Sequence, residues 1–191
     1  MASQLVTSAF WHTTFDDIFK DFSPDEWTLE PTDRRMPKDW GQYKDSAKVK
    51  FFCKDCGRSW TSMNGRVIFW YKKIDEKDEK KELNTEEGKC TSDEGNNDEP
   101  KKTDKYSLRF RLYGQQCNVC TVGTPDGTFT DPMWYEDETK RILDNVYEKI
   151  KQAIYNIPPE DSNDRKRPGR MRMPHDKRRC QACYEGQCSS K

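Results

Sequence analysis

The chain has 191 residues, enough for one domain with tails. Charged residues make up 36% of it and hydrophobic residues only 32%, so little apolar surface is available for a core. Lys+Arg and Asp+Glu both number 34, which excludes a general electrostatic attraction to nucleic acids or membranes. A chain of this composition needs additional stabilisation, and metal ions or disulfides commonly supply it.

The N-terminus lacks a basic segment followed by a continuous apolar run, so it does not match a secretory signal peptide. No stretch approaches the roughly 18 apolar residues that span a bilayer. We therefore expect a soluble, cytoplasmic chain. In a reducing cytosol, cysteine thiolates favour zinc over disulfides.

Aromatic residues at helical spacing predict a helix over residues 8–22, with Ser8 as its cap. We expect this helix to dock on the core; the alternative is a partner-binding amphipathic helix. Residues 23–47 contain three prolines and are expected to be irregular, with Trp27 and Trp40 covering a sheet. The first predicted unit is thus residues 1–47, an N-terminal helix and wrapping segment.

Extended structure is predicted for residues 49–53 and 60–62, and strands for 66–72 and 107–113. The last two are expected to pair antiparallel. In 107–113 the apolar residues alternate with arginines. This alternation places Arg109 and Arg111 on the outer face and Leu108, Phe110 and Leu112 on the inner face.

The insert 73–105 between these strands is strongly charged and has almost no apolar residues. Such a segment cannot offset the entropy of ordering, so we expect a disordered acidic loop. Cys90 lies in it without a neighbouring cysteine, and we do not predict it to bind a metal.

Asp131-Pro132 has the signature of a helix start, a cap residue followed by proline at the first helical position. It predicts a long helix near 132–156 that ends before Pro158. Its apolar face comprises Ile142, Leu143, Val146, Tyr147, Ile150 and Ile154, and its solvated face comprises Glu138, Lys140, Arg141, Asp144, Lys149 and Lys151. Residues 158–170 are expected to form a polar linker.

Three CxxC pairs are the strongest motif in the sequence. They are Cys53/Cys56, Cys117/Cys120 and Cys180/Cys183, with Cys188 close behind the third. A single CxxC also fits a redox dithiol, but three in a short chain favour structural zinc. A closed zinc site takes four ligands, and His175 supplies the eighth ligand for two sites.

Two ways of pairing these ligands remain open. In the first, the first two CxxC pairs bind one ion at the end of a sheet, as in a zinc ribbon, and His175, Cys180, Cys183 and Cys188 bind a second ion. In the second, the C-terminal cluster completes a site begun by an upstream pair. We favour the first. Each closed site would contribute on the order of 10 kcal/mol to folding.

The predicted fold is therefore α+β: a small antiparallel sheet with zinc-ribbon-like turns, two flanking helices and two structural zinc ions. The second predicted unit is a zinc-finger domain over 48–188. All candidate ligands are used in closed sites, and the sequence has no phosphate-binding loop, nucleophile elbow or dinucleotide fingerprint. We predict that the protein is not an enzyme and has no small-molecule substrate.

The stretch Phe51 to Ser62, with the pattern F-x-C-x-x-C-x-R-S-W-T-S, resembles the three-CxxC zinc-finger family. So do the block that ends in Cys117 and Cys120 and the tail from Pro174 to Cys188. Within that family the chain looks most like the receptor-transporting proteins, over about residues 10–188. The zygote arrest proteins share the finger but bind RNA.

The resemblance implies a cytosolic, membrane-facing zinc domain that helps odorant, taste and other G-protein-coupled receptors reach the cell surface. Family members usually carry a C-terminal membrane anchor, and none follows Cys188 here, so we expect membrane association through partners or through a missing anchor. The insert 73–105 is longer than the family pattern implies.

One interferon-induced branch of the family acts in antiviral defence and is linked to RNA. An alternative prediction is therefore an RNA-binding, innate-immune zinc finger. The basic run 165–179 supports it, because this run lies beside the compact, zinc-knuckle-like cluster from His175 to Cys188. The alternative without a function is that the run is a solvated linker. The candidate RNA-binding residues are Arg170, Arg172, Lys177, Arg178, Arg179 and the stacking ring of Tyr184.

Overall fold

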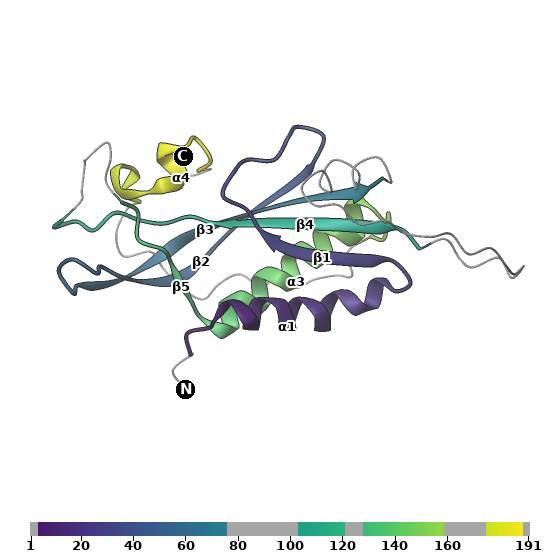
Figure 1. Cartoon of the computed structure of the whole chain (residues 1–191), viewed down its shortest axis with the longest axis horizontal. Helices are drawn as coiled ribbons and strands as arrows, with labels where there is room; N and C mark the ends of the chain where they lie inside the picture. Colours follow the sequence, from purple (N-terminus) through teal and green to yellow (C-terminus); the bar gives the residue numbers. More distant parts are fainter. Residues whose placement is uncertain (1–3, 76–102, 121–127, 159–174, 189–191) are drawn as a thin grey trace, which may run out of the picture.

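The computed structural model describes residues 4–75, 103–120, 128–158 and 175–188. Two long helices, α1 (Ser8–Phe19) and α3 (Glu136–Ala153), lie on one side of a curled sheet (Figure 1). The 3-10 turn η1 (Lys20–Phe22) extends α1. At the C-terminus, η2 (Lys177–Arg179) and the short helix α4 (Gln181–Tyr184) lie on the opposite side of the sheet.

Five strands form the sheet in the order β1-β4-β3-β2-β5. The central strand β3 pairs antiparallel with both β2 and β4, and β2 also pairs antiparallel with β5. At the other edge, β1 runs parallel to β4. The strands are β1 (Glu26–Pro31), β2 (Gly41–Phe52), β3 (Ser59–Ile74), β4 (Lys105–Leu112) and β5 (Met133–Trp134). The predicted α+β class and the β3–β4 pairing are confirmed, while the parallel edge pair makes the sheet mixed.

Strand β3 is buried on both faces. Val67 and Phe69 belong to the main core under the helices, whereas Ile68 and Trp70 belong to a second core under the C-terminal segment. All four side chains are at most 1% exposed. A strand covered on both faces needs a continuous apolar run rather than alternation, which explains the sequence of this stretch.

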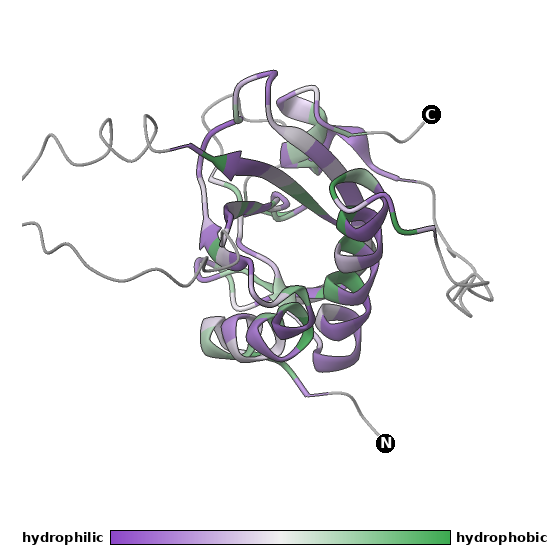
Figure 2. Cartoon of the chain, turned by 90° about the vertical axis from the view of Figure 1, so that its right-hand side faces the viewer, coloured by the Kyte–Doolittle hydropathy of each residue, from purple (hydrophilic) through white to green (hydrophobic). Residues whose placement is uncertain are grey.

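Both helices are amphipathic, and Figure 2 shows hydrophobic and hydrophilic residues mixed along their ribbons. Trp11 of α1 stacks on Phe110 of β4, with ring centroids 5.3 Å apart, and meets the edge of Trp134 at 5.4 Å. The apolar residues of α3 that are fully buried are Ile142, Leu143, Val146 and Ile150. The expectation that the N-terminal helix docks on the core is confirmed.

The helix predicted over residues 8–22 is present as α1 and η1, but its predicted cap and the predicted start of the second helix are wrong. Thr7, not Ser8, precedes the first turn of α1, and its side chain makes no capping hydrogen bond. Asp131-Pro132 does not begin α3, which starts at Glu136. Met133 and Trp134 instead pair with β2 and are therefore extended. Tertiary strand pairing has overridden a local capping signature here.

The segment predicted to be irregular, residues 23–47, contains β1 and the first half of β2. Trp27 lies on β1 and packs on the main core, whereas Trp40 packs on the second core. The predicted extended piece 60–62 and strand 66–72 are one continuous strand, β3.

The face of α3 predicted to be solvated is partly buried. Glu138 is 8% exposed and accepts a hydrogen bond from Arg141 at 2.9 Å. Arg141 also donates to the carbonyl of Ser46 at 2.9 Å, and Asn145 donates to Asp45 at 2.9 Å. These contacts tie α3 to β2 through buried polar groups, which need partners to avoid a desolvation cost.

Several predictions fall on residues that the structure does not describe. They include Cys90 and nearly all of the insert 73–105. Near the two ends of this insert, Ile74 of β3 pairs with Lys105 of β4. Most of the predicted linker 158–170 also lies outside the described residues, with Arg170 and Arg172. Among the described residues, no helix combines the length and the apolar content that crossing a membrane requires.

Candidate metal centres

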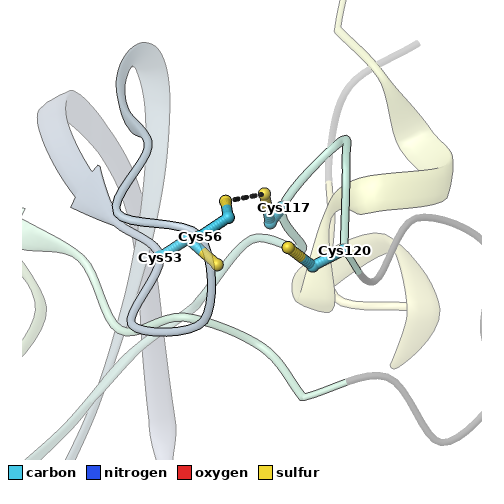
Figure 3. A group of neighbouring side chains, drawn as sticks. All are labelled: Cys53, Cys56, Cys117 and Cys120. Atoms are coloured by element: carbon cyan, nitrogen blue, oxygen red, sulfur yellow. Dashed lines mark hydrogen bonds between the residues drawn. The ribbon is translucent and has the colours of Figure 1, made fainter.

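The first cluster, called the ribbon site here, contains Cys53, Cys56, Cys117 and Cys120. Figure 3 shows the four sulfurs meeting between two turns of the chain. Their Sγ atoms all lie within 4.8 Å of one another, and those of Cys56 and Cys117 are 3.8 Å apart. Tetrahedral zinc with Zn–S bonds of about 2.3 Å requires sulfurs about 3.8 Å apart. The geometry therefore fits a four-thiolate zinc ion.

A tight turn between β2 and β3 positions the first pair. The backbone N–H of Cys53 donates to the carbonyl of Arg58, and that of Gly57 donates to the carbonyl of Cys53, both at 2.9 Å. Gly57 has a φ of 70°, in the left-handed region that glycine adopts without a steric penalty. The turn thus needs glycine directly after Cys56.

The thiols of the ribbon site are unequal. Backbone N–H groups, first that of Val119, lower the pKa of Cys117 to about 7. A hydrogen bond with the thiol of Cys56 is the main cause that raises the pKa of Cys120 to about 12. Neighbouring thiols cannot all become thiolates without a cation, because their negative charges repel. A bound divalent ion supplies that cation.

The second cluster, called the C-terminal site, contains His175, Cys180, Cys183 and Cys188, again with all ligand atoms within 4.8 Å of one another. His175 Nε2 lies 3.1 Å from the sulfur of Cys183 and 3.6 Å from that of Cys188. For tetrahedral zinc with one nitrogen and three sulfur ligands, the nitrogen–sulfur distance is about 3.5 Å. These residues fit a second zinc ion.

Short-range turns gather these ligands. Cys180 caps α4, and its carbonyl accepts from the N–H of Cys183 at 3.1 Å. Gly186, with a φ of 66°, reverses the chain so that the N–H of Cys188 donates to the carbonyl of Ala182 at 3.0 Å. Burial raises the pKa of Cys180 and is the main cause that raises that of Cys183 to about 12.

The imidazole of His175 is suited to metal binding. Burial, followed by the charge of Arg66, lowers its pKa, which favours the neutral ring that binds metals. The structure thus gathers all eight predicted ligand residues into two groups, and the groups are those of the first pairing. Two clusters with these donors fit two zinc ions.

The two sites are neighbours along a short backbone ladder. The N–H of Gln116, next to Cys117, donates to the carbonyl of Arg179 at 2.8 Å, and Arg179 Nε donates back to the carbonyl of Gln116 at 2.9 Å. The N–H of Gln181 donates to the carbonyl of Gly114 at 3.1 Å. Residues leading into one metal site therefore pair with residues leading into the other.

Some contacts of the C-terminal site were not predicted from the sequence. Arg111, expected only to face outward, forms a two-point ion pair with Glu185, and Arg66 points a guanidinium nitrogen at Cys188. An arginine that alternates with apolar residues on a strand predicts only that its side chain lies on the outer face, and not which residue it contacts. Its partner lies more than 70 positions away in the sequence.

The candidate RNA-binding residues differ in their surroundings. Lys177 is exposed, the side chain of Arg178 is 81% exposed, and Tyr184 is 70% exposed with its ring 5.9 Å from that of Phe129. The side chain of Arg179 already has partners within the protein. It donates a hydrogen bond to the carbonyl of Gln116 and lies over the ring of Trp60, 5.4 Å from its centroid.

Comparison with known proteins places these observations in a family. The family model of the three-CxxC zinc-ribbon type, described as a zinc-binding domain, matches residues 46–186. Receptor-transporting protein 4 of Homo sapiens is 26% identical to the chain over 93% of the chain and 63% of the human protein. Receptor-transporting protein 4 of Mus musculus is 24% identical over 94% of the chain and 64% of the mouse protein.

The chain thus spans less than two thirds of the length of either relative. No solved structure matches it. The relatives confirm the resemblance to receptor-transporting proteins, and the family model covers most of the chain, including all eight residues of the two clusters except Cys188. The chain therefore belongs to the three-CxxC zinc-ribbon family of zinc-binding domains.

Proposed function

We propose that this protein is a non-catalytic, zinc-binding adaptor that helps G-protein-coupled membrane receptors, of the odorant or taste type, to reach the cell surface. The observation that carries the proposal is the similarity to two receptor-transporting proteins along more than nine tenths of the chain. The zinc-binding domain would be the part that binds the receptor.

The chemistry of the two clusters supports a binding role. Each would hold its zinc ion with four protein ligands: Cys53, Cys56, Cys117 and Cys120 in the ribbon site, and His175, Cys180, Cys183 and Cys188 in the C-terminal site. A zinc ion with four protein ligands has no open position for a substrate or water, so it stabilises shape. Zinc would thus hold the surface that recognises the receptor.

The same proposal places the domain on the cytosolic side of a membrane, where its thiolates stay reduced. It would associate with the membrane through the receptor or through a membrane anchor. Neither association depends on a small-molecule substrate.

Co-expression with a panel of odorant and taste receptors carrying an extracellular epitope tag tests the proposal. We expect the wild-type chain to raise surface staining of at least one receptor in flow cytometry and to co-precipitate with it. Cys117→Ser, which removes a buried ribbon-site thiol, should lose both effects, and Cys90→Ser should keep them. A folded, zinc-loaded wild-type protein that changes no receptor and precipitates none would contradict the proposal.

RNA binding, with a role in antiviral innate immunity, is the second candidate. The exposure of Arg178 and Tyr184 beside the C-terminal site favours it, because a cation and an aromatic ring are the groups that bind phosphates and stacked bases. Lys177, and Arg170 and Arg172 earlier in the sequence, would add phosphate contacts.

Fluorescence anisotropy with single-stranded RNA tests this candidate. Affinity should fall steeply with rising salt, and the double change Lys177→Ala and Arg178→Ala should weaken it. Arg179→Ala is a poor test variant, because Arg179 also contacts Gln116 and Trp60. An absence of binding at low salt would remove this candidate.

A further inference from the structure

Two cations from neighbouring strands lie beneath the C-terminal site. Lys44 of β2 and Arg66 of β3 flank the same part of the sheet, where Lys44 pairs with Ile68 and Ser46 pairs with Arg66. Ile68 belongs to the second core, which also includes Cys180, so this face of the sheet is the one that the C-terminal segment covers.

Both cations reach toward the last ligand of that site. Arg66 Nη2 lies 3.9 Å from the sulfur of Cys188. Lys44 Nζ lies 3.4 Å from both the carbonyl oxygen and the side-chain oxygen of Gln187, the residue before Cys188. One positive charge therefore contacts the thiol of Cys188, and a second lies at the residue before it.

Among residues 4–75, 103–120, 128–158 and 175–188, neither cation forms an ion pair with a carboxylate. The other hydrogen bond of the Arg66 side chain is neutral, from Nη1 to the carbonyl of Asp45 at 3.4 Å. Its Nε is buried and has no acceptor within the same ranges. A half-buried guanidinium without an anion is destabilising, so an anion is expected at this position.

The C-terminal site supplies such an anion once zinc is bound. One Zn²⁺ with three thiolates and a neutral imidazole has a net charge of −1. In the ribbon site, four thiolates around Zn²⁺ give −2, yet the charged group 3.9 Å from the sulfur of Cys53 is the carboxyl of Asp55, which cannot offset it. The two metal centres therefore differ in their charge environment.

We propose that Arg66 is a positioning residue of the C-terminal zinc site. Its guanidinium donates a charge-assisted hydrogen bond to the Cys188 thiolate and, with Lys44, balances the negative charge of the metal–thiolate centre. Outer hydrogen bonds of this kind fix the orientation of a metal ligand and tune its metal affinity. The inference rests on zinc in the C-terminal site and is independent of receptor transport.

The chemical consequence is a less reactive Cys188. A hydrogen bond from a cation withdraws electron density from the sulfur, which slows the attack of the zinc-bound thiolate on an electrophile. Among the ligands of the C-terminal site, Arg66 donates toward the sulfur of Cys188, so the protection should be specific to Cys188. Loss of the guanidinium should also weaken zinc binding at this site about tenfold or more.

Site-resolved alkylation of the zinc-loaded full chain tests the proposal. The protein is treated with limiting N-ethylmaleimide, with and without a competing chelator, and labelling of each cysteine is followed by peptide mass spectrometry. For each cysteine, the labelling rate in Arg66→Met is divided by the rate in wild type. Without chelator, we expect this ratio to be larger for Cys188 than for Cys180 or Cys183. Arg66→Met should also lose zinc protection of the C-terminal cysteines at about tenfold less chelator, whereas Arg66→Lys should retain much of both effects.

Arg111→Met is the matched control. Arg111 also reaches the C-terminal segment from the same sheet, but through Glu185 and not through a metal ligand. It should raise the labelling of Cys180, Cys183 and Cys188 together. In the experiment without chelator, wild-type labelling of Cys188 in Arg66→Met, or an equal increase at all three cysteines, would overturn the proposal.

Arg66→Met could unfold as a whole, which native mass spectrometry would show as loss of zinc from both sites. In that case Lys44→Met is the variant that tests the proposal. That variant keeps the guanidinium and removes only the second cation. We expect a smaller increase in labelling that is again confined to Cys188. No change at Cys188 in a folded Lys44→Met would then overturn the proposal.

Discussion

Arg111 on β4 and Glu185 at the end of α4 form a two-point ion pair, with both nitrogen–oxygen distances at 2.7 Å. The two side chains are 16% and 27% exposed, so the pair is shielded from solvent. Two parallel hydrogen bonds between a guanidinium and a carboxylate fix orientation as well as distance. This pair fastens the C-terminal site to the sheet.

Glu185→Gln should loosen that attachment. It removes the negative charge and leaves the half-buried Arg111 without its anion, at a cost of about 1–3 kcal/mol. Hydrogen exchange should show lower protection of backbone amides in 180–188, with β2 and β3 unaffected. Asp176→Asn is a suitable control, because Asp176 pairs with the exposed Arg178. Equal protection in Glu185→Gln and wild type would contradict the assigned role.

Removal of zinc should unfold much of the domain. Each structural zinc ion contributes on the order of 10 kcal/mol, and the sequence is poor in apolar residues, so the metal-free chain has little to replace it. Native mass spectrometry should find two zinc ions in wild type, and circular dichroism should show loss of structure after exhaustive chelation.

Single cysteine variants should separate the two ions. Cys117→Ser and Cys180→Ser each remove a ligand that is at most 2% exposed, from the ribbon site and the C-terminal site respectively. Each variant should hold one tightly bound zinc ion, and Cys90→Ser should hold two. A variant of either site that still binds two ions tightly would show that the ligand assignment is wrong.

The glycines of the two metal turns should be sensitive to substitution for conformational reasons alone. A Cβ added at Gly57 or Gly186 meets nothing within 4 Å, but both residues have positive φ. Gly186→Ala should therefore cost about 1–2 kcal/mol, and Gly186→Asn less, because Asn tolerates this region better. Thermal denaturation of the zinc-loaded variants measures the difference. Equal losses for Ala and Asn would point to a different cause.

Arg141→Met should destabilise the attachment of α3 to β2. The change leaves the carboxylate of Glu138, which is 8% exposed, and that of Asp45 without their shared cation. Removing one partner of a buried ion pair costs about 3–5 kcal/mol. Lys140→Met, the neighbouring change in an exposed pair with Asp144, should cost less than about 1 kcal/mol. Urea denaturation of both variants tests the contrast, and similar midpoints would refute it.

Much of the fold could be predicted because its signals are local. The continuous apolar run of β3, the alternation in β4 and the helical spacing of Ile142, Val146 and Ile150 each follow from side chains a few positions apart. Strand β1 was missed because it is a short edge strand containing glutamates and a proline. Its parallel partner β4 lies about 80 positions away.

The metal ligands show the same division. CxxC spacing and a total of seven grouped cysteines with one histidine indicated two four-ligand sites by sequence alone, because a tight turn and a tetrahedral ion impose that spacing. The sequence left two pairings open. The choice depends on which turns the sheet brings together, and only the tertiary structure decides that.

By itself, then, the sequence determined the donor chemistry, the number of metal sites it can complete and the amphipathic elements. Tertiary structure decided that Met133 and Trp134 are extended despite a helix-start signature, that Glu138 is buried, and that Arg66 and Arg111 lie under the C-terminal site. The reason is physical. Spacing and propensity act between neighbours in the chain, whereas burial and charge pairing depend on distant segments that packing alone brings into contact.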